Sequence, residues 1–110
     1  MINEKELLQC YKDAEEFFEF SLFKVFSEPI RWEIIKYLSL HDASDIGTIA
    51  ENFSQDRSVI SRHLNMMYEK GLLNKAKISR RVVYEVNCKS LLEQFENITD
   101  KLRKMCSYCE

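Results

Sequence analysis

The chain has 110 residues, of which 45% are hydrophobic and 31% charged, with only two glycines and one proline. This length suits one small domain, and the scarcity of glycine and proline favours a mainly α-helical fold with short loops. No apolar run approaches the roughly 20 residues that a membrane span requires, and the acidic N-terminal segment lacks the apolar stretch of a signal peptide. We therefore expect a cytoplasmic location and no membrane partner.

Residues 4–26 are predicted to form a first helix that is unusually rich in aromatic side chains. Its apolar residues recur at helical spacing, but they cover too many faces for a surface helix of a small monomer. We therefore expect a partner subunit to cover one of these faces. The aromatic residues of this segment are Tyr11, Phe17, Phe18, Phe20, Phe23 and Phe26.

A second helix is predicted from Pro29 to about Leu40, because a proline fits the first turn of a helix and Ser27 precedes it as a candidate N-cap. Residues 44–71 then form two short helices with a tight turn between them, capped by Ser44 and Ser54. The side chains expected to face inward from these three helices are Ile30, Ile34, Ile35, Leu38, Ile46, Ile49, Ala50, Phe53, Val59, Ile60, Leu64, Met67 and Tyr68.

The second short helix carries polar side chains of the kind that contact DNA, and Gly71 follows it as a stop. A helix-turn-helix needs this pair of helices, one to brace and one to enter the major groove. Serine, arginine, glutamine and asparagine side chains bind base edges and phosphates. The candidate DNA-binding residues here are Gln55, Arg57, Ser58, Ser61, Arg62 and His63. We expect a phosphate or base contact, rather than a metal, for His63.

Residues 72–88 are predicted to form a two-stranded β-hairpin, called the wing below, from strands 72–78 and 81–86. Its basic residues Lys75, Lys77, Arg80 and Arg81 are candidates for contacts with flanking DNA backbone or the minor groove. The tip at residues 79–80 has no glycine, which makes a tight turn strained, so a longer or mobile tip is expected.

Charge is distributed unevenly along the chain. Residues 54–81 hold seven lysines and arginines against two acidic residues, a net charge of +5, whereas the whole chain carries −2. A basic patch on an acidic body is typical of a nucleic-acid binder, because neutralising phosphates releases counterions. A merely solvated basic surface is the alternative, and the adjacent helix-turn-helix pattern argues against it.

A last helix is predicted over residues 89–108. Its apolar side chains step by four and three residues, which is a short heptad seam suited to helix pairing. The same seam could instead pack on the core of its own chain. Together with the aromatic first helix, it favours a homodimer built on residues 1–26 and 89–110. The seam residues are Leu91, Phe95, Ile98, Leu102 and Met105.

These segments in this order resemble the ArsR/SmtB family of bacterial repressors over about residues 20–105. The resemblance rests on SEPIRWEIIKYL, SDIGTIAENF and SQDRSVISRHLNMMYEKGLL, and above all on the pattern Ser58-x-x-Ser61-x-His63-Leu64 with Gly71-Leu72 after it. It implies one winged helix-turn-helix domain over residues 1–110, with about five helices and the hairpin wing. It also implies a homodimer that represses an operon and leaves its double-stranded DNA operator on binding a metal or metalloid, or on thiol oxidation.

Two metal sites known in that family are absent from this sequence. Asp42 and Ser44 stand where many members have a Cys-x-Cys pair. Cys88, Ser90, Lys101 and Lys104 stand where others place a zinc site on the last helices, and lysines cannot replace imidazole ligands at neutral pH.

Four cysteines remain: Cys10, Cys88, Cys106 and Cys109. Cys106 and Cys109 are three residues apart and share a helix face. With Cys10 they would make three thiolates, a set suited to arsenite or antimonite, whereas zinc or cadmium would need a fourth ligand. The alternatives are a thiol redox or sulfide switch using the same residues, core-filling roles for Cys10 or Cys88, and an unligated C-terminal end.

No nucleophile–base constellation or phosphate-binding glycine loop is present, so we expect no enzyme. A thiol oxidoreductase is rejected because Cys106-x-x-Cys109 closes the chain instead of opening a helix after a strand. A winged helix that binds only protein is disfavoured by the +5 segment. The sequence therefore predicts a DNA-binding repressor released by a thiol-bound effector, with an effector-independent regulator as a further alternative.

Overall fold

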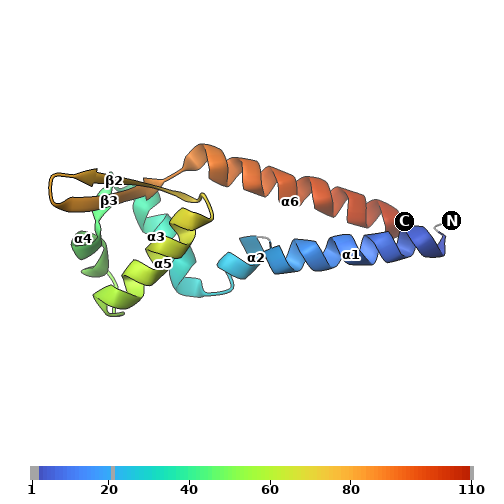
Figure 1. The fold of residues 1–110 in the computed structure, drawn as a ribbon, viewed down its shortest axis with the longest axis horizontal. Helices are drawn as coiled ribbons and strands as arrows, with labels where there is room; N and C mark the ends of the chain where they lie inside the picture. Colours follow the sequence, from blue (N-terminus) through green and yellow to red (C-terminus); the bar gives the residue numbers. More distant parts are fainter. Residues whose placement is uncertain (1–2, 21, 110) are drawn as a thin grey trace. The chain divides into compact units, whose positions relative to one another are not determined.

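The computed structural model describes residues 3–20 and 22–109, and the side chains of these residues other than 14–20 and 108–109. Over that range the chain forms six helices and one three-stranded antiparallel sheet (Figure 1). The helices are α1 (Glu4–Phe20), α2 (Leu22–Val25), α3 (Pro29–Leu40), α4 (Ile46–Ala50), α5 (Arg57–Glu69) and α6 (Cys88–Cys109). The strands are β1 (Ser44–Asp45), β2 (Leu73–Ile78) and β3 (Arg81–Val86).

The chain divides into two compact units. The central unit, residues 28–91, contains α3, α4, α5 and the sheet, and the second unit contains α1, α2 and most of α6. The order of elements in the central unit, a helix-turn-helix followed at once by a hairpin, is a winged helix-turn-helix. The predicted fold class is confirmed.

The core of the central unit is formed by side chains that α3, α4, α5 and the strands turn toward each other. Most of the inward-facing positions predicted on α3 and α5 are buried, and Ile49 is buried on α4. The prediction for Tyr68 is wrong, because 42% of its surface is exposed. The other predicted inward positions are half-buried: Ile30, Ile46, Ala50, Phe53 and Val59. The buried apolar residues of this unit are Ile34, Ile35, Leu38, Ile49, Ile60, Leu64, Met67, Leu72, Leu73, Val83 and Tyr84.

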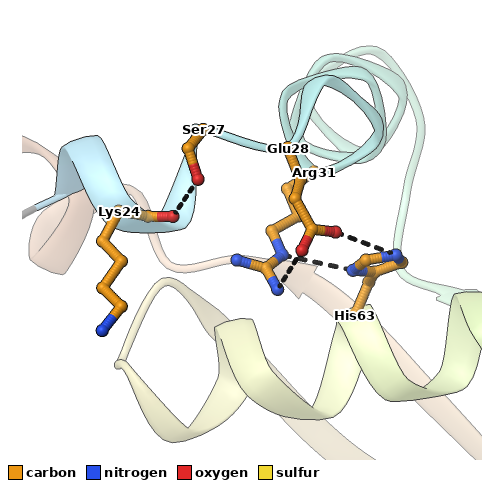
Figure 2. Close-up of polar contacts among 5 residues, drawn as sticks. All are labelled: Lys24, Ser27, Glu28, Arg31 and His63. Atoms are coloured by element: carbon orange, nitrogen blue, oxygen red, sulfur yellow. Dashed lines mark hydrogen bonds and ion pairs between the residues drawn. The ribbon is translucent and has the colours of Figure 1, made fainter.

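The predicted caps of three helices are wrong. The residue before α3 is Glu28, and Ser27 instead donates its hydroxyl hydrogen bond to the carbonyl of Lys24 (Figure 2). Asp45, not Ser44, caps α4, because its carboxylate accepts a hydrogen bond of 2.8 Å from the N–H of Thr48. At α5 the N-cap is Asp56, not Ser54, and its side chain makes no cap hydrogen bond.

Gly71 ends α5 as predicted. Its φ of 80° is readily adopted only by glycine. The N–H of Gly71 bonds to the carbonyl of Tyr68, and the N–H of Leu72 bonds to that of Met67. This pair of bonds is the Schellman motif, which satisfies the last carbonyls of a helix. It turns the chain directly from α5 into β2.

The sheet has β3 at its centre, between β1 and β2. The prediction of a two-stranded hairpin missed β1, whose Ser44 and Asp45 pair with Tyr84 and Val83. The tip is tighter than expected, since Ile78 pairs with Arg81 and only two residues form the turn. Ser79 takes a φ of 58°, so the strain predicted for a glycine-free turn is present but does not lengthen it.

Within the segment predicted as one helix, residues 4–26, the second unit is helical over α1 and α2, and position 21 between them lies outside the described residues. Leu22 and Val25 are buried, and the rings of Phe26 and Phe95 stack at 6.3 Å between centroids. The side chains of Phe17, Phe18 and Phe20, named in the aromatic prediction, also lie outside the described set. None of the helices in the described part of the chain is both long and apolar enough to cross a membrane.

Candidate nucleic-acid interface

Helix α5 presents a polar face to solvent and an apolar face to the core. Arg57, Ser58 and Arg62 are exposed and Ser61 is half-buried. Ile60, Leu64 and Met67 are buried on the side of the helix that faces the core. Gln55 does not lie on this helix, because α5 begins at Arg57 and Gln55 is an exposed residue of the preceding turn. The outward set on α5 is therefore two arginines and two serines, which suits contact with phosphates and base edges.

His63 is the exception to the predicted outward face. It is only 3% exposed and lies between Ile60, Leu64 and Met67 on the inward side of α5. The expectation that its imidazole faces DNA is wrong. The physical reason is that His63 follows Ile60 by three residues, and residues at this spacing share a helix face.

A polar cluster holds the His63 ring against the start of α3 (Figure 2). The Nε of Arg31 donates to His63 Nδ1 at 3.2 Å, and the Nε2 of His63 lies 3.6 Å from a carboxylate oxygen of Glu28. Arg31 also pairs with Glu28 at 3.4 Å. Since Nδ1 accepts a hydrogen bond, the ring is the neutral tautomer with its proton on Nε2, directed at the carboxylate.

Burial lowers the pKa of His63 below its usual 6.5, with the nearby Arg31 and Arg62 acting in the same direction and Glu28 opposing them. The neutral ring is therefore the form that the folded chain favours. In this form the cluster links the N-terminal end of α3 to the middle of α5. It fixes how α5 is rotated about its axis, and hence which side chains reach solvent.

A second polar link joins the wing to the start of α4. Arg81 contacts the Asp45 carboxylate through Nε at 2.7 Å and through a terminal nitrogen at 2.6 Å. Hydrogen bonds from Thr48, then from Arg81, lower the pKa of Asp45 to about 2. The carboxylate is charged at any physiological pH, so Arg81 braces the wing through this ion pair, while its side chain stays 65% exposed. Its contact with DNA stays a prediction.

The other three basic wing residues differ in their contacts with the rest of the chain. The Nζ of Lys75 lies 5.3 Å from the ring centre of Tyr68 and 5.8 Å from that of Tyr84, a cation–π arrangement over α5 and β3. Lys77 is exposed on β2 and Arg80 is exposed at the tip. For these two, the described part of the chain records no ion pair or ring contact, unlike Lys75 and Arg81.

Sequence reasoning missed three residues that organise this surface: Glu28, Arg31 and Asp45. The spacing of Asp45 and Thr48 is a capping signal that could have been preferred to Ser44. Glu28 and Arg31 left no comparable signal, because their partner His63 is 32 positions away from Arg31 in the sequence.

The candidate effector cysteines lie in the second unit. Cys10 on α1 is half-buried and Cys106 on α6 is exposed, while the side chain of Cys109 lies outside the described set. Cys88, at the start of α6, is exposed, so the core-filling alternative for this residue is wrong. Among the side chains that are described, no three His, Cys, Asp or Glu residues gather in a way that could hold a metal ion.

Comparison with known proteins now identifies the central unit. Residues 28–75 match the family model described as bacterial regulatory protein, arsR family. The part of the chain that carries the helix-turn-helix is similar to the arsR family. The match spans α3 through the start of β2 and so contains the whole helix-turn-helix. No curated protein matches the chain in sequence.

Solved structures of similar fold agree with this assignment. A possible transcriptional regulator for arsenical resistance is 28% identical, with a TM-score of 0.63, covering 72% of this chain and 80% of that one. An ArsR-like transcriptional regulator from Rhodococcus sp. RHA1 is 22% identical, with a TM-score of 0.64 and coverage of 90% and 91%. A transcriptional regulator homologue from Pyrococcus horikoshii OT3 is 15% identical, with a TM-score of 0.59 and coverage of 90% and 98%. The last two show the shared fold alone.

Proposed function

We propose that this chain is a repressor of the arsR type that binds a two-fold symmetric DNA operator through α5 and the wing. The observation that carries the proposal is the exposed face of α5, where Arg57, Ser58 and Arg62 project from a helix braced on its other side by buried residues. The +5 segment that contains this face supplies the attraction to phosphates. In a dimer, two such helices enter successive major grooves roughly 34 Å apart.

The test begins with selection of a bound duplex from a random pool, followed by fluorescence anisotropy at several salt concentrations. Arg62→Ala should weaken binding and make its salt dependence shallower, because one fewer cation displaces counterions. Arg103→Ala is the matched control, since Arg103 is an exposed arginine of α6 outside the basic segment. Equal affinities of the two variants at physiological salt, or no enriched duplex at all, would refute DNA recognition by α5.

A homodimer supplies the second half of the binding site. Several large apolar side chains on α1 and α6 are exposed in the single chain, and their cost in water falls if a second copy covers them. These side chains are Leu7, Leu8, Tyr11, Leu92, Phe95 and Leu102. They belong to the two segments assigned to dimerisation from the sequence.

Sedimentation equilibrium tests this assembly. Phe95→Glu with Leu102→Glu should shift the chain from dimer toward monomer, because two charges would replace apolar contacts at the seam. Leu40→Glu is the control, since Leu40 is an apolar residue of α3 that is 82% exposed. An unchanged mass for the α6 variant, or equal dissociation in both variants, counts against pairing through α6.

The effector proposed for release is a soft metal or metalloid, foremost arsenite or antimonite, bound by the thiolates of Cys10, Cys106 and Cys109. Three thiolates match the preference of trivalent arsenic, and soft ions select sulfur over the carboxylates that dominate the surface. The similar solved structure of a possible transcriptional regulator for arsenical resistance supports this choice of first probe. Reversible oxidation of the same thiols is the alternative effector chemistry.

Native mass spectrometry of the reduced protein separates these possibilities. As three As–S bonds replace the As–O bonds of arsenous acid, three waters leave, so each occupied site should gain one arsenic atom and lose three thiol protons. Cys106→Ser should abolish this adduct. Cys88→Ser is the control, because this exposed cysteine is not part of the proposed set. If arsenite, zinc and cadmium all fail to bind but mild oxidation forms a disulfide that lowers DNA affinity, the redox alternative replaces the metal proposal.

A further inference from the structure

A small recess lies where the wing tip passes the helix-turn-helix. Its cavity volume is about 250 Å³, and it is lined by residues 45–47, Arg57 and residues 80–82. Three separate elements therefore line it: the start of α4, the first residue of α5, and the turn into β3. Typical pockets for drug-sized ligands begin at roughly 300 Å³, so this recess suits a small group.

Three arginines and one aspartate are among the residues that line this recess. Arg81 and Asp45 neutralise each other through their short ion pair. Arg57 and Arg80 have no ion-pair or hydrogen-bond partner for their guanidinium groups among the residues that the structure describes. Two positive charges thus face one small cavity without a counter-ion from the chain.

The local backbone lets Arg57 lie close to α4. Gly47 has no side chain, and a Cβ built there would stand 3.5 Å from a terminal nitrogen of Arg57. The ion pair with Asp45 holds Arg81, the first residue of β3, in place. Because Arg80 directly precedes Arg81, its backbone is held on that side. Both free arginines are therefore directed to the same recess from different elements.

We propose that Arg57 and Arg80 form a shared phosphate site in this recess, which takes one backbone phosphodiester of the bound DNA. A phosphate offers two unesterified oxygens, and arginine binds such oxygens through parallel N–H groups. One phosphate held from both sides ties the wing to the start of α5, so the two DNA-contacting elements engage at a fixed spacing. The inference rests on the proposed DNA binding and narrows it, with Arg81 acting as a brace and not a ligand.

The first experiment uses inorganic phosphate and needs no DNA. In spectra of the arginine side-chain N–H groups of the full chain, the signals of Arg57 and Arg80 should shift together and saturably as phosphate is added. Arg57→Lys and Arg80→Lys assign the two signals, and the Arg81 signal is the internal control that should move little. Shifts spread evenly over exposed arginines such as Arg103, or no shift, would overturn the site.

The second experiment uses a duplex selected by the wild-type protein, with single neutral methylphosphonate groups walked along the backbone. At one position in each half-site, a methylphosphonate should weaken wild-type binding about tenfold, because one charge-assisted contact is lost. The same substitution should have no effect on an Arg57→Met, Arg80→Met double variant. Lys77→Met, which removes an exposed wing charge outside the recess, should keep the wild-type sensitivity.

The salt dependence distinguishes one shared phosphate from two separate contacts. If Arg57 and Arg80 share a phosphate, the double variant should lower the slope of log affinity against log salt by about one contact, and the single effects should not add. A loss of two contacts with additive effects would overturn the shared site. If no duplex is selected, the proposed function fails, but the phosphate titration still decides whether the recess binds phosphate. If the recess binds phosphate but no position in the DNA is sensitive to methylphosphonate, the recess is a site for a free anion and its DNA role is overturned.

Discussion

The contact between Arg31 and His63 allows a quantitative test of how α5 is held. In Arg31→Met the aliphatic part of the side chain stays, but the hydrogen bond from Nε to His63 Nδ1 is lost. The imidazole nitrogen then remains in a site where the residue is 3% exposed, without its partner. A buried acceptor left unsatisfied costs about 1–3 kcal/mol. The parallel contact of Arg31 with Glu28 adds little, because 53% of the Glu28 side chain is exposed.

We therefore expect Arg31→Met to lower the free energy of unfolding by about 2 kcal/mol. Urea denaturation at one fixed protein concentration, followed by circular dichroism, measures this change. Arg103→Met is the matched control, since Arg103 pairs with Asp100 at 3.0 Å but the two side chains are 74% and 67% exposed. An effect of Arg31→Met no larger than that of Arg103→Met would refute the reasoning. Adding His63→Leu to Arg31→Met should recover stability, because no unpaired polar atom then remains buried.

The same cluster predicts the direction of a pH dependence. The pKa of His63 is lower in the folded chain than the unfolded value of 6.5, so the unfolded chain binds more protons below that pH. The stability that comes from the neutral ring is therefore complete above pH 6.5 and is lost as the pH falls through the folded pKa. Denaturation curves at a series of pH values should show this loss in the wild type and not in His63→Leu. An identical pH profile for both proteins would contradict the assignment.

Three further substitutions test the fold around the site. Leu64→Ala, at a fully buried position, should cost about 2–5 kcal/mol in urea denaturation, whereas Leu40→Ala, at a position 82% exposed, should stay within about 0.5 kcal/mol. Asp45→Ala should lower the melting temperature more than Asp45→Asn, because asparagine still accepts from the N–H of Thr48 while both variants lose the Arg81 ion pair; equal melting temperatures would count against the cap. Ser79→Gly should stabilise the chain by about 0.5–1 kcal/mol by relieving the positive φ, and a loss of stability would show that the serine side chain is needed there.

The fold was largely predictable because its main elements are local. Helical spacing located α3 and α5, and Gly71 marked the end of α5 through a conformation that few other residues adopt. The short elements were not predictable in this way. Two residues of β1 carry too little pattern to be recognised, and they become a strand only because β3 pairs with them. The three caps were misassigned because serine, aspartate and asparagine are all good caps, and the choice depends on where the helix begins.

The candidate DNA surface was predictable in composition but not in geometry. The basic segment and the polar face of α5 follow from residue types and helical period. Whether an arginine is free depends on what lies opposite it, and the partners of Arg31 and Arg81 are 32 and 36 positions away in sequence. For this reason His63 and Arg81 were assigned to DNA although each is engaged within the chain.

On the candidate DNA surface, the residues that orient α5 and the wing differ from the exposed arginines proposed to contact DNA. The cluster of Glu28, Arg31 and His63 sets the orientation of α5, and the ion pair of Asp45 and Arg81 sets the orientation of the wing. Because all five residues belong to the central unit, both links act within one compact body. Substitutions at the links should therefore change stability together with DNA affinity, whereas substitutions at the exposed Arg57, Arg62 and Arg80 should change affinity and its salt dependence alone. A variant of Arg62 or Arg80 that destabilises the chain as much as Arg31→Met would show that this separation does not hold.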